Sequence, residues 1–283
     1  MGAGEERKGK TMDVKLGICN FCVPGTGVFA PQIVSEMGLD GMSLELGSYE
    51  HGWPLGQRMI QDLYLDAQQK YGIEYPNIGV SDGDNVPFHA RVGTKWDEIV
   101  NAEGKTAIDA AAYMGIKLVF FSNFNASLMQ NEEDIENTAR RYRYFCDYAG
   151  EKGIQIGCEN PNTVEVQKKL YQMVDRENFN LFFDTCNHAC LTDIDIHNVL
   201  KELYPYYINQ MHVKDGIKGQ NAQYVLGTGT TGYYESIDFL KKQNYSGWLI
   251  LENLYELETM RKLNPDYFEI MKEDIRVLKE STK

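Results

Sequence analysis

The sequence has no long apolar run and comparatively few basic residues. No segment approaches the roughly 20 consecutive apolar residues of a membrane-spanning helix, so we expect no membrane partner. The first ten residues, MGAGEERKGK, are charged and lack the apolar core of a secretory signal peptide. Lysine and arginine number 28 against 41 acidic residues, which gives a formal net charge of −13. Because an acidic chain repels phosphate backbones, we also expect no nucleic acid partner.

Cysteine occurs six times without a secretion signal. This combination favours free thiols and a cytoplasmic location. Cys19 and Cys22 form a C-x-x-C motif at the end of an expected strand, whereas redox motifs of this kind usually begin a helix. We therefore interpret the two residues as small buried side chains rather than as a redox or zinc site.

Short apolar runs alternate with amphipathic segments along the chain. Eight runs are bounded by Gly, Asn, Asp or Pro, as buried parallel strands are: 14–19, 41–46, 75–80, 116–122, 154–160, 180–185, 208–215 and 248–253. Helical patterns fill most of the gaps; residues 131–153 begin with acids and end at Gly153, which suits the helix dipole. An α/β fold follows, a single (β/α)₈ TIM barrel over residues 13–283. Residues 1–12 are expected to form a disordered tail, with Met12 as an alternative start.

An open doubly wound sheet is the alternative fold. It is disfavoured because no G-x-G-x-x-G motif follows the first strand. In a barrel, active sites lie at the carboxyl ends of the strands. The fold therefore predicts that chemically capable side chains gather at those ends.

Four consecutive late strands each end in a side chain that can bind a metal. These residues are Glu159, Asp184, His212 and Glu252. A carboxylate among apolar neighbours must be paired or metal-bound to avoid a large desolvation cost, although each residue could instead cap a neighbouring helix. Three carboxylates and an imidazole suit one hard or borderline divalent cation. Mn²⁺ is preferred, with Mg²⁺, Co²⁺ or Zn²⁺ as alternatives.

A cation at these residues would leave coordination positions for two vicinal oxygens of a substrate. It would polarise a carbonyl and stabilise an enediolate. Two carboxylates on opposite sides of the substrate plane can then remove a proton from one face and return it to the other. This chemistry predicts a sugar isomerase or epimerase whose small-molecule partner is a free or phosphorylated sugar.

Several motifs resemble those of the xylose isomerase-like barrel superfamily of sugar phosphate isomerases and epimerases. The resemblance covers roughly residues 14–280 and rests on LGICNF, GCEN, FDTCN, MHVKD and LGTGTTGYYESIDFLKKQNYSGWLILEN. The last is the most specific, with a G-x-G turn, a helix and a Tyr-x-Gly-Trp before the final strand. The resemblance implies four metal ligands, namely Glu159, Asp184, His212 and Glu252. It also implies that Glu159 and Glu252 are the acid/base pair of the ketose 3-epimerase branch.

The resemblance further implies substrate contacts on the later segments. Glu165 lies six residues after Glu159, where a Glu of the 3-epimerases holds substrate O1 and O2; a surface residue is the alternative. Lys218 stands where the epimerases carry a basic substrate-binding residue. Lys214, within HVKD, is a better polar candidate, although it could instead pair with Asp215.

The stretch FDTCNH leaves a choice between two neighbouring residues. The substrate-touching residue of the family lies three positions after the aspartate, often as His, and here that position is Asn187. We expect Asn187 to contact the substrate and keep His188 as a candidate, because a loop could turn it inward. At the earlier strand ends, Glu45, His51 and Trp53 are expected near the rim of the site, and Asn123 and Asn125 over the end of the fourth strand.

Other functions use the same scaffold. A lyase or dehydratase acting on an inosose or a 3-oxo-sugar forms the same enediolate, so the ligand set leaves it open. An endonuclease IV-like DNA repair enzyme needs a His-rich three-metal cluster, and the third and fourth strand ends, NIGVSDGD and FFSNFN, contain no His. A barrel that binds without catalysis would not need the four ligands. Assembly as a homodimer or homotetramer stays open, as does phosphate binding by GTGTTG at 227–232.

Overall fold

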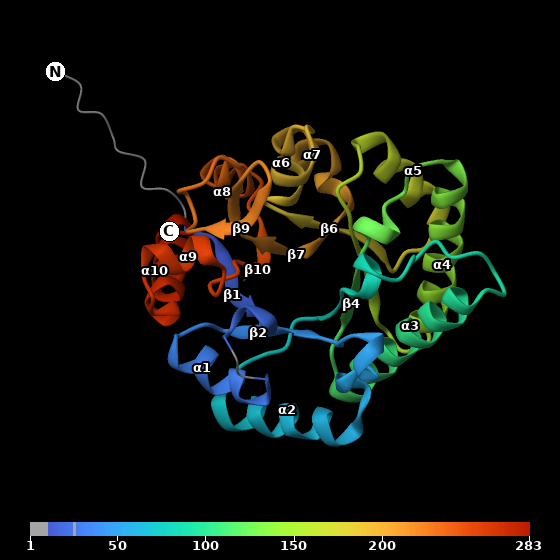
Figure 1. The fold of residues 1–283 in the computed structure, drawn as a ribbon, viewed down its shortest axis with the longest axis horizontal. Coiled ribbons are helices and arrows are strands. Elements are labelled where there is room, and N and C mark those ends of the chain that lie inside the picture. The colour runs from blue at the N-terminus through green and yellow to red at the C-terminus, as the bar shows by residue number, and fades with distance from the viewer. Residues whose placement is uncertain (1–10, 25–26) are drawn as a thin grey trace.

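Eight parallel strands close into a barrel in the computed structural model, which describes residues 11–24 and 27–283 (Figure 1). Around the barrel the order is β1, β10, β7, β6, β5, β4, β3 and β2. The strands are β1 (Asp13–Cys19), β2 (Gly41–Glu45), β3 (Ile78–Val80), β4 (Leu118–Ser122), β5 (Gln155–Glu159), β6 (Phe179–Asp184), β7 (Tyr207–Val213) and β10 (Ser246–Leu251). Each predicted run overlaps one of them, which confirms the (β/α)₈ fold.

Helices surround this barrel in Figure 1. They are α1 (Ala30–Glu36), α2 (Arg58–Tyr71), α3 (Lys95–Met114), α4 (Glu132–Gly150), α5 (Val164–Val174), α6 (Asn187–Leu191), α7 (Ile196–Leu203), α8 (Tyr233–Lys242), α9 (Glu258–Leu263) and α10 (Tyr267–Ser281). Local sequence sets their ends. The side chain of Thr94 accepts the backbone N–H of Asp97 at the start of α3, and Gly115 ends α3 with a left-handed φ of 74°.

A two-stranded antiparallel hairpin, β8 (Asp215–Ile217) and β9 (Gln220–Tyr224), follows β7. This hairpin was not predicted from the sequence, because QNAQY is polar at most positions and carries no apolar run. Its turn contains Gly219 with a positive φ of 79°. The hairpin stands over the carboxyl end of the barrel, where Asn221 and Gln223 of β9 reach the cavity described below.

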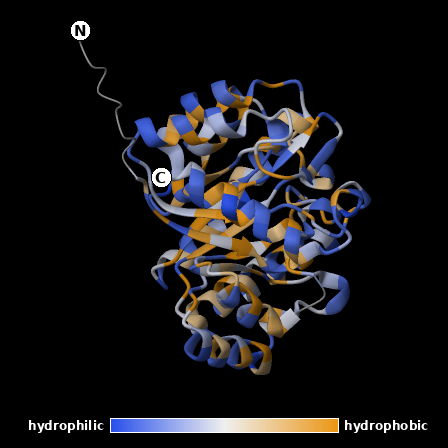
Figure 2. Cartoon of the chain, turned by 90° about the vertical axis from the view of Figure 1, so that its left-hand side faces the viewer, coloured by the Kyte–Doolittle hydropathy of each residue, from blue (hydrophilic) through white to orange (hydrophobic). Residues whose placement is uncertain are grey.

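Aromatic side chains fill the barrel beneath its carboxyl end. The rings of Phe120 and Phe182 stack with centroids 4.5 Å apart, and both meet the ring of His212 edge-on at 5.2 and 4.7 Å. Gly157 gives Phe120 its space, because a Cβ there would lie 2.9 Å from the Cβ of Phe120. A second, larger apolar core lies between strands and helices, and Figure 2 shows hydrophobic colour concentrated on the central strands.

The two ends of the described chain meet. Residues 1–10 of the expected tail lie outside the described residues, and Met12 donates its backbone N–H to the carbonyl of Thr282 at 2.9 Å. All six cysteines are free and buried. Among the described residues, every helix is too short or too polar to cross a membrane.

Candidate active site

Four adjacent strands bring the predicted metal ligands together at the carboxyl end of the barrel. Glu159 ends β5, Asp184 ends β6, His212 lies near the end of β7, and Glu252 directly follows β10. One ligand atom from each lies within 4.8 Å of the others. The parallel register explains this meeting, because Asp184 pairs with His212 on the neighbouring strand. Three of the side chains are buried, and that of Glu252 is 15% exposed.

The donor atoms fit a divalent cation. Metal–oxygen bonds of about 2.1 Å place opposite donors about 4 Å apart, which the cluster matches. His212 Nδ1 lies 3.5 Å from Glu159 Oε1 and 3.2 Å from Glu252 Oε2, yet it makes no hydrogen bond. Asp184 Oδ2 is buried and also makes none, while its Oδ1 accepts two backbone N–H groups. Buried polar atoms without a hydrogen bond are rare, and these two, whose nearest polar neighbours are the other charged groups of the cluster, fit an additional ligand such as a cation.

Lys214 adds a positive charge beside the cluster. Its Nζ lies 2.5 Å from Glu252 Oε2 and 3.3 Å from Asp184 Oδ2, so its partners are these carboxylates rather than Asp215. Burial raises the pKa of Asp184 to about 7, against the lowering effect of Lys214. Burial would also raise the pKa of Glu252, but His212 and Lys214 outweigh it and hold that pKa below its usual range. Glu252 is therefore a carboxylate at neutral pH.

The side chains of Asn187 and His188, at the start of α6, point in different directions. Asn187 lines the cavity, donates from Nδ2 to Glu159 Oε1 at 2.9 Å, and accepts at Oδ1 from Asn221 at 2.8 Å. His188 turns away from the cavity, with its Nε2 3.1 Å from the carbonyl oxygen of Asn162. Both polar atoms of Asn187 are thus engaged, which suits it to hold Glu159 in place.

His188 is expected to make stability depend on pH. Burial lowers the pKa of His188 to about 4, against about 6.5 in an unfolded chain. The unfolded state then binds more protons between these values, so this contribution is complete above pH 6.5 and is lost as pH falls towards 4. The loss is on the order of 3 kcal/mol. Denaturation of wild type and His188→Gln at pH 7.5, 5.5 and 4 measures it. Equal pH slopes for the two proteins would contradict the assignment.

Glu165 and Lys218 do not reach the cavity. Glu165 lies exposed on the first turn of α5, where the chain has already left the barrel rim. Lys218 lies at the tip of the β8–β9 hairpin and pairs with Asp193 at 2.7 Å. The unpredicted hairpin explains this outcome for Lys218, because it carries the residues after His212 outward.

A cavity of about 670 Å³ opens above the ligand cluster. Polar residues from the ends of β2, β3 and β4 form the wall opposite the late strands: Glu45, Ser81, Asp82, Asp84 and Asn125. Apolar residues at the wall and rim include Phe21, Phe124, Leu191, Leu254 and Leu257. Glu45 accepts the backbone N–H and the hydroxyl of Ser81, both at 3.0 Å, and burial raises its pKa to about 8. Glu45 and Asn125 had been expected here from sequence, whereas Asp82 and Asp84 had not. The other residues expected near the early strand ends, His51, Trp53 and Asn123, do not line the cavity.

The small-residue turn after β9 is wrapped around a carboxylate of the protein itself. Asp215 Oδ2 accepts the N–H groups of Gly227 at 2.8 Å and Gly229 at 2.9 Å. Its Oδ1 accepts the N–H of Gly216 at 2.8 Å and the hydroxyl of Thr231 at 2.7 Å. These donors of the GTGTTG segment are therefore already occupied, and they do not form an open phosphate site.

Comparisons with known proteins agree with this fold. The sequence model of the xylose isomerase-like TIM barrel matches residues 31–281. The chain is 23% identical over 253 residues to a 2-epi-5-epi-valiolone 7-phosphate 2-epimerase of an Actinoplanes species, covering 86% of this chain and 88% of that protein. It is 25% identical over 281 residues to an inosose dehydratase of Clostridium botulinum, covering 84% and 89% respectively.

A solved structure of similar fold is D-psicose 3-epimerase with D-tagatose from Clostridium cellulolyticum H10. It superposes with a TM-score of 0.76 at 14% identity, covering 95% of this chain and 98% of that chain. Identity this low supports a shared fold alone. The match of the family model covers nearly all of the described barrel, and on this ground the chain belongs to the xylose isomerase-like TIM barrel family.

Proposed function

We propose that the protein is a metal-dependent epimerase that inverts the carbon next to the carbonyl of a keto sugar. The observation that carries this proposal is the pair of glutamates, Glu159 and Glu252, whose carboxylate oxygens lie 3.5 and 3.2 Å from His212 Nδ1. The four-residue cluster would hold a divalent cation, which when bound polarises a substrate carbonyl and stabilises an enediolate.

The two glutamates are contacted by different residues, which suits them to different roles. Glu252 is kept ionised by Lys214 and His212 and serves as the base that removes the proton beside the carbonyl. Glu159 is oriented by Asn187 and returns a proton to the opposite face. Glu159 ends β5 and Glu252 follows β10, with β7 and β6 between these strands, which would let the two carboxylates approach the substrate from different sides.

The charge of the cavity favours an unphosphorylated substrate. Among the described residues that line it, Lys214 is the only basic one, and it is already paired with Glu252. The opposite wall carries Asp82 and Asp84, neither of which forms an ion pair with a described basic residue. Carboxylates accept hydrogen bonds from neutral hydroxyls and repel a phosphate dianion. The Actinoplanes relative is named for a 7-phosphate substrate, so this chain is proposed to differ from it.

A dehydratase is the second candidate, and Glu45 favours it. With its pKa raised to about 8, Glu45 is protonated at neutral pH and could protonate a departing hydroxyl. The reaction would begin with the same proton removal and then expel water from the β-carbon. The similarity to an inosose dehydratase supports the same candidate.

Proton exchange in D₂O separates these functions. Purified protein with added Mn²⁺ is incubated with free ketohexoses, an inosose and ketose phosphates, and the products are followed by NMR. We expect deuterium at C3 together with the C3 epimer, at rates at least about tenfold higher for free than for phosphorylated ketoses.

Each other outcome of this experiment has a definite meaning. Deuterium at C1 or C2 with an aldose product would indicate aldose–ketose isomerisation, and an unsaturated or dicarbonyl product would indicate the dehydratase. A preference for phosphates would contradict the role of the acidic wall. Absence of exchange with every substrate, in protein shown to bind Mn²⁺, would overturn the proposed epimerase.

A further inference from the structure

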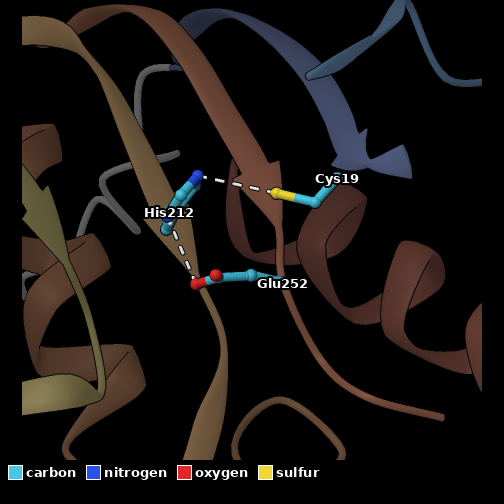
Figure 3. A group of neighbouring side chains, drawn as sticks. All are labelled: Cys19, His212 and Glu252. Atoms are coloured by element: carbon cyan, nitrogen blue, oxygen red, sulfur yellow. Dashed lines mark hydrogen bonds and ion pairs between the residues drawn. The ribbon is translucent and has the colours of Figure 1, made fainter. Parts of the chain in front are cut away.

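We propose that Cys19 is a positioning residue that fixes the tautomer of His212 for metal binding. This inference rests on the proposed metal-dependent function. In Figure 3, the imidazole of His212 lies between Cys19 and Glu252. Cys19 Sγ is 3.5 Å from His212 Nε2, and the opposite nitrogen, Nδ1, is 3.2 Å from Glu252 Oε2.

The two ring nitrogens of His212 must have different roles, because one binds the cation and the other keeps the proton. A neutral imidazole carries one proton, and the nitrogen without it is the one that can bind a cation. Because Nδ1 faces the three carboxylates, it is the nitrogen that must be free of the proton, which leaves Nε2 as the donor. Metal-binding histidines usually donate this second N–H to a carboxylate, a backbone carbonyl or water. Here the atom in that position is a thiol sulfur.

The surroundings of His212 offer Nε2 no other acceptor among the described residues. Phe120 and Phe182 meet the ring edge-on and carry no polar atom. Cys19 is fully buried at the last position of β1, next to β10 in the barrel, so water does not replace it. Loss of the sulfur would leave the Nε2 proton without a partner and favour the tautomer that cannot bind the cation through Nδ1.

A direct ligand role is the competing explanation. Cys19 Sγ, one ring nitrogen of His212 and a carboxylate oxygen of Glu252 lie within 4.8 Å of one another, so a thiophilic cation could join them. In that case His212 would bind through Nε2, and the carboxylates Glu159 and Asp184 would be left out. The two explanations therefore differ in whether sulfur touches the cation.

Metal affinity, measured without substrate, tests the proposal. Mn²⁺ dissociation constants of wild type, Cys19→Ala, Cys19→Ser and the buried control Cys146→Ala are compared by chelator competition, with thermal unfolding of each metal-free protein. We expect Cys19→Ala to bind Mn²⁺ about 10- to 100-fold more weakly. Cys19→Ser should recover part of the affinity because its hydroxyl accepts a hydrogen bond, and Cys146→Ala should match wild type. Should Cys19→Ala fail to fold, Cys19→Val replaces it as the variant without an acceptor.

Two spectra complete the test. Nitrogen-15 NMR of histidine-labelled, metal-free protein, at a pH high enough to leave the His212 ring neutral, should show His212 protonated at Nε2 in wild type and a changed tautomer ratio in Cys19→Ala. The Co²⁺-loaded protein should lack a sulfur-to-cobalt charge-transfer band, and such a band would establish the ligand role instead. Wild-type Mn²⁺ affinity in Cys19→Ala would also overturn the proposal. Failure of wild type itself to bind any divalent cation would instead refute the proposed function.

Discussion

Glu252→Gln is expected to lower turnover by roughly 10³-fold or more while the barrel stays folded. The amide cannot accept the proton from the carbon beside the carbonyl, and general acid–base groups contribute about 10²- to 10⁴-fold. It also removes a negative charge from the cation cluster. Gln has nearly the shape of Glu, so the barrel is expected to form, although loss of the charge beside buried Lys214 should lower stability. The rate of deuterium incorporation, with thermal unfolding and Mn²⁺ affinity of the same samples, measures the effect.

Two further variants make this result specific. Glu159→Gln should also block epimer formation, because the second face then lacks its proton donor. Glu165→Gln is the matched control, since Glu165 is exposed on α5 outside the cavity. Unchanged rates in both Glu159→Gln and Glu252→Gln would refute the acid/base pair. A large loss in Glu165→Gln would show that α5 approaches the substrate in the working enzyme.

The cluster could be predicted because strand geometry is regular. Successive side chains of a strand alternate between faces, so Asp184 shares the inner face with Phe182, two residues before it. The parallel order then brings the ends of neighbouring strands level, and Asp184 lies in register with His212. Apolar runs that end in an acid or a histidine were therefore enough to predict which residues meet.

Residues beyond the strand ends were not predictable in this way. Asp82 and Asp84 lie in a short turn after β3, and a turn has no fixed alternation to tell which side chains face inward. Lys218 lies away from the cavity because it belongs to a hairpin that no apolar run predicted. The choice between Asn187 and His188 depended on where α6 begins, because neighbouring residues of a helix point about 100° apart.

Asp215→Ala is expected to destabilise the fold by about 3–5 kcal/mol, a large part of the roughly 5–15 kcal/mol that holds a typical domain together. The Asp215 carboxylate is 1% exposed and accepts four hydrogen bonds, three of them from backbone N–H groups. Removing it leaves these donors buried without a partner, at about 1–3 kcal/mol for each one that relaxation cannot satisfy. Urea denaturation measures the loss. Asp193→Ala is the control, because the exposed Asp193–Lys218 pair should contribute little to stability.

The same variant tests what the turn can bind. In wild type the N–H groups of Gly227 and Gly229 point at Asp215, so inorganic phosphate should not stabilise the protein through this turn. In Asp215→Ala these donors are released, and backbone N–H groups that converge in this way attract anions. We therefore expect phosphate to raise the melting temperature of the variant more than that of wild type or Asp193→Ala. An equal rise in melting temperature for all three proteins would mean that phosphate binds elsewhere. The shape of the turn would then depend on more than the Asp215 carboxylate.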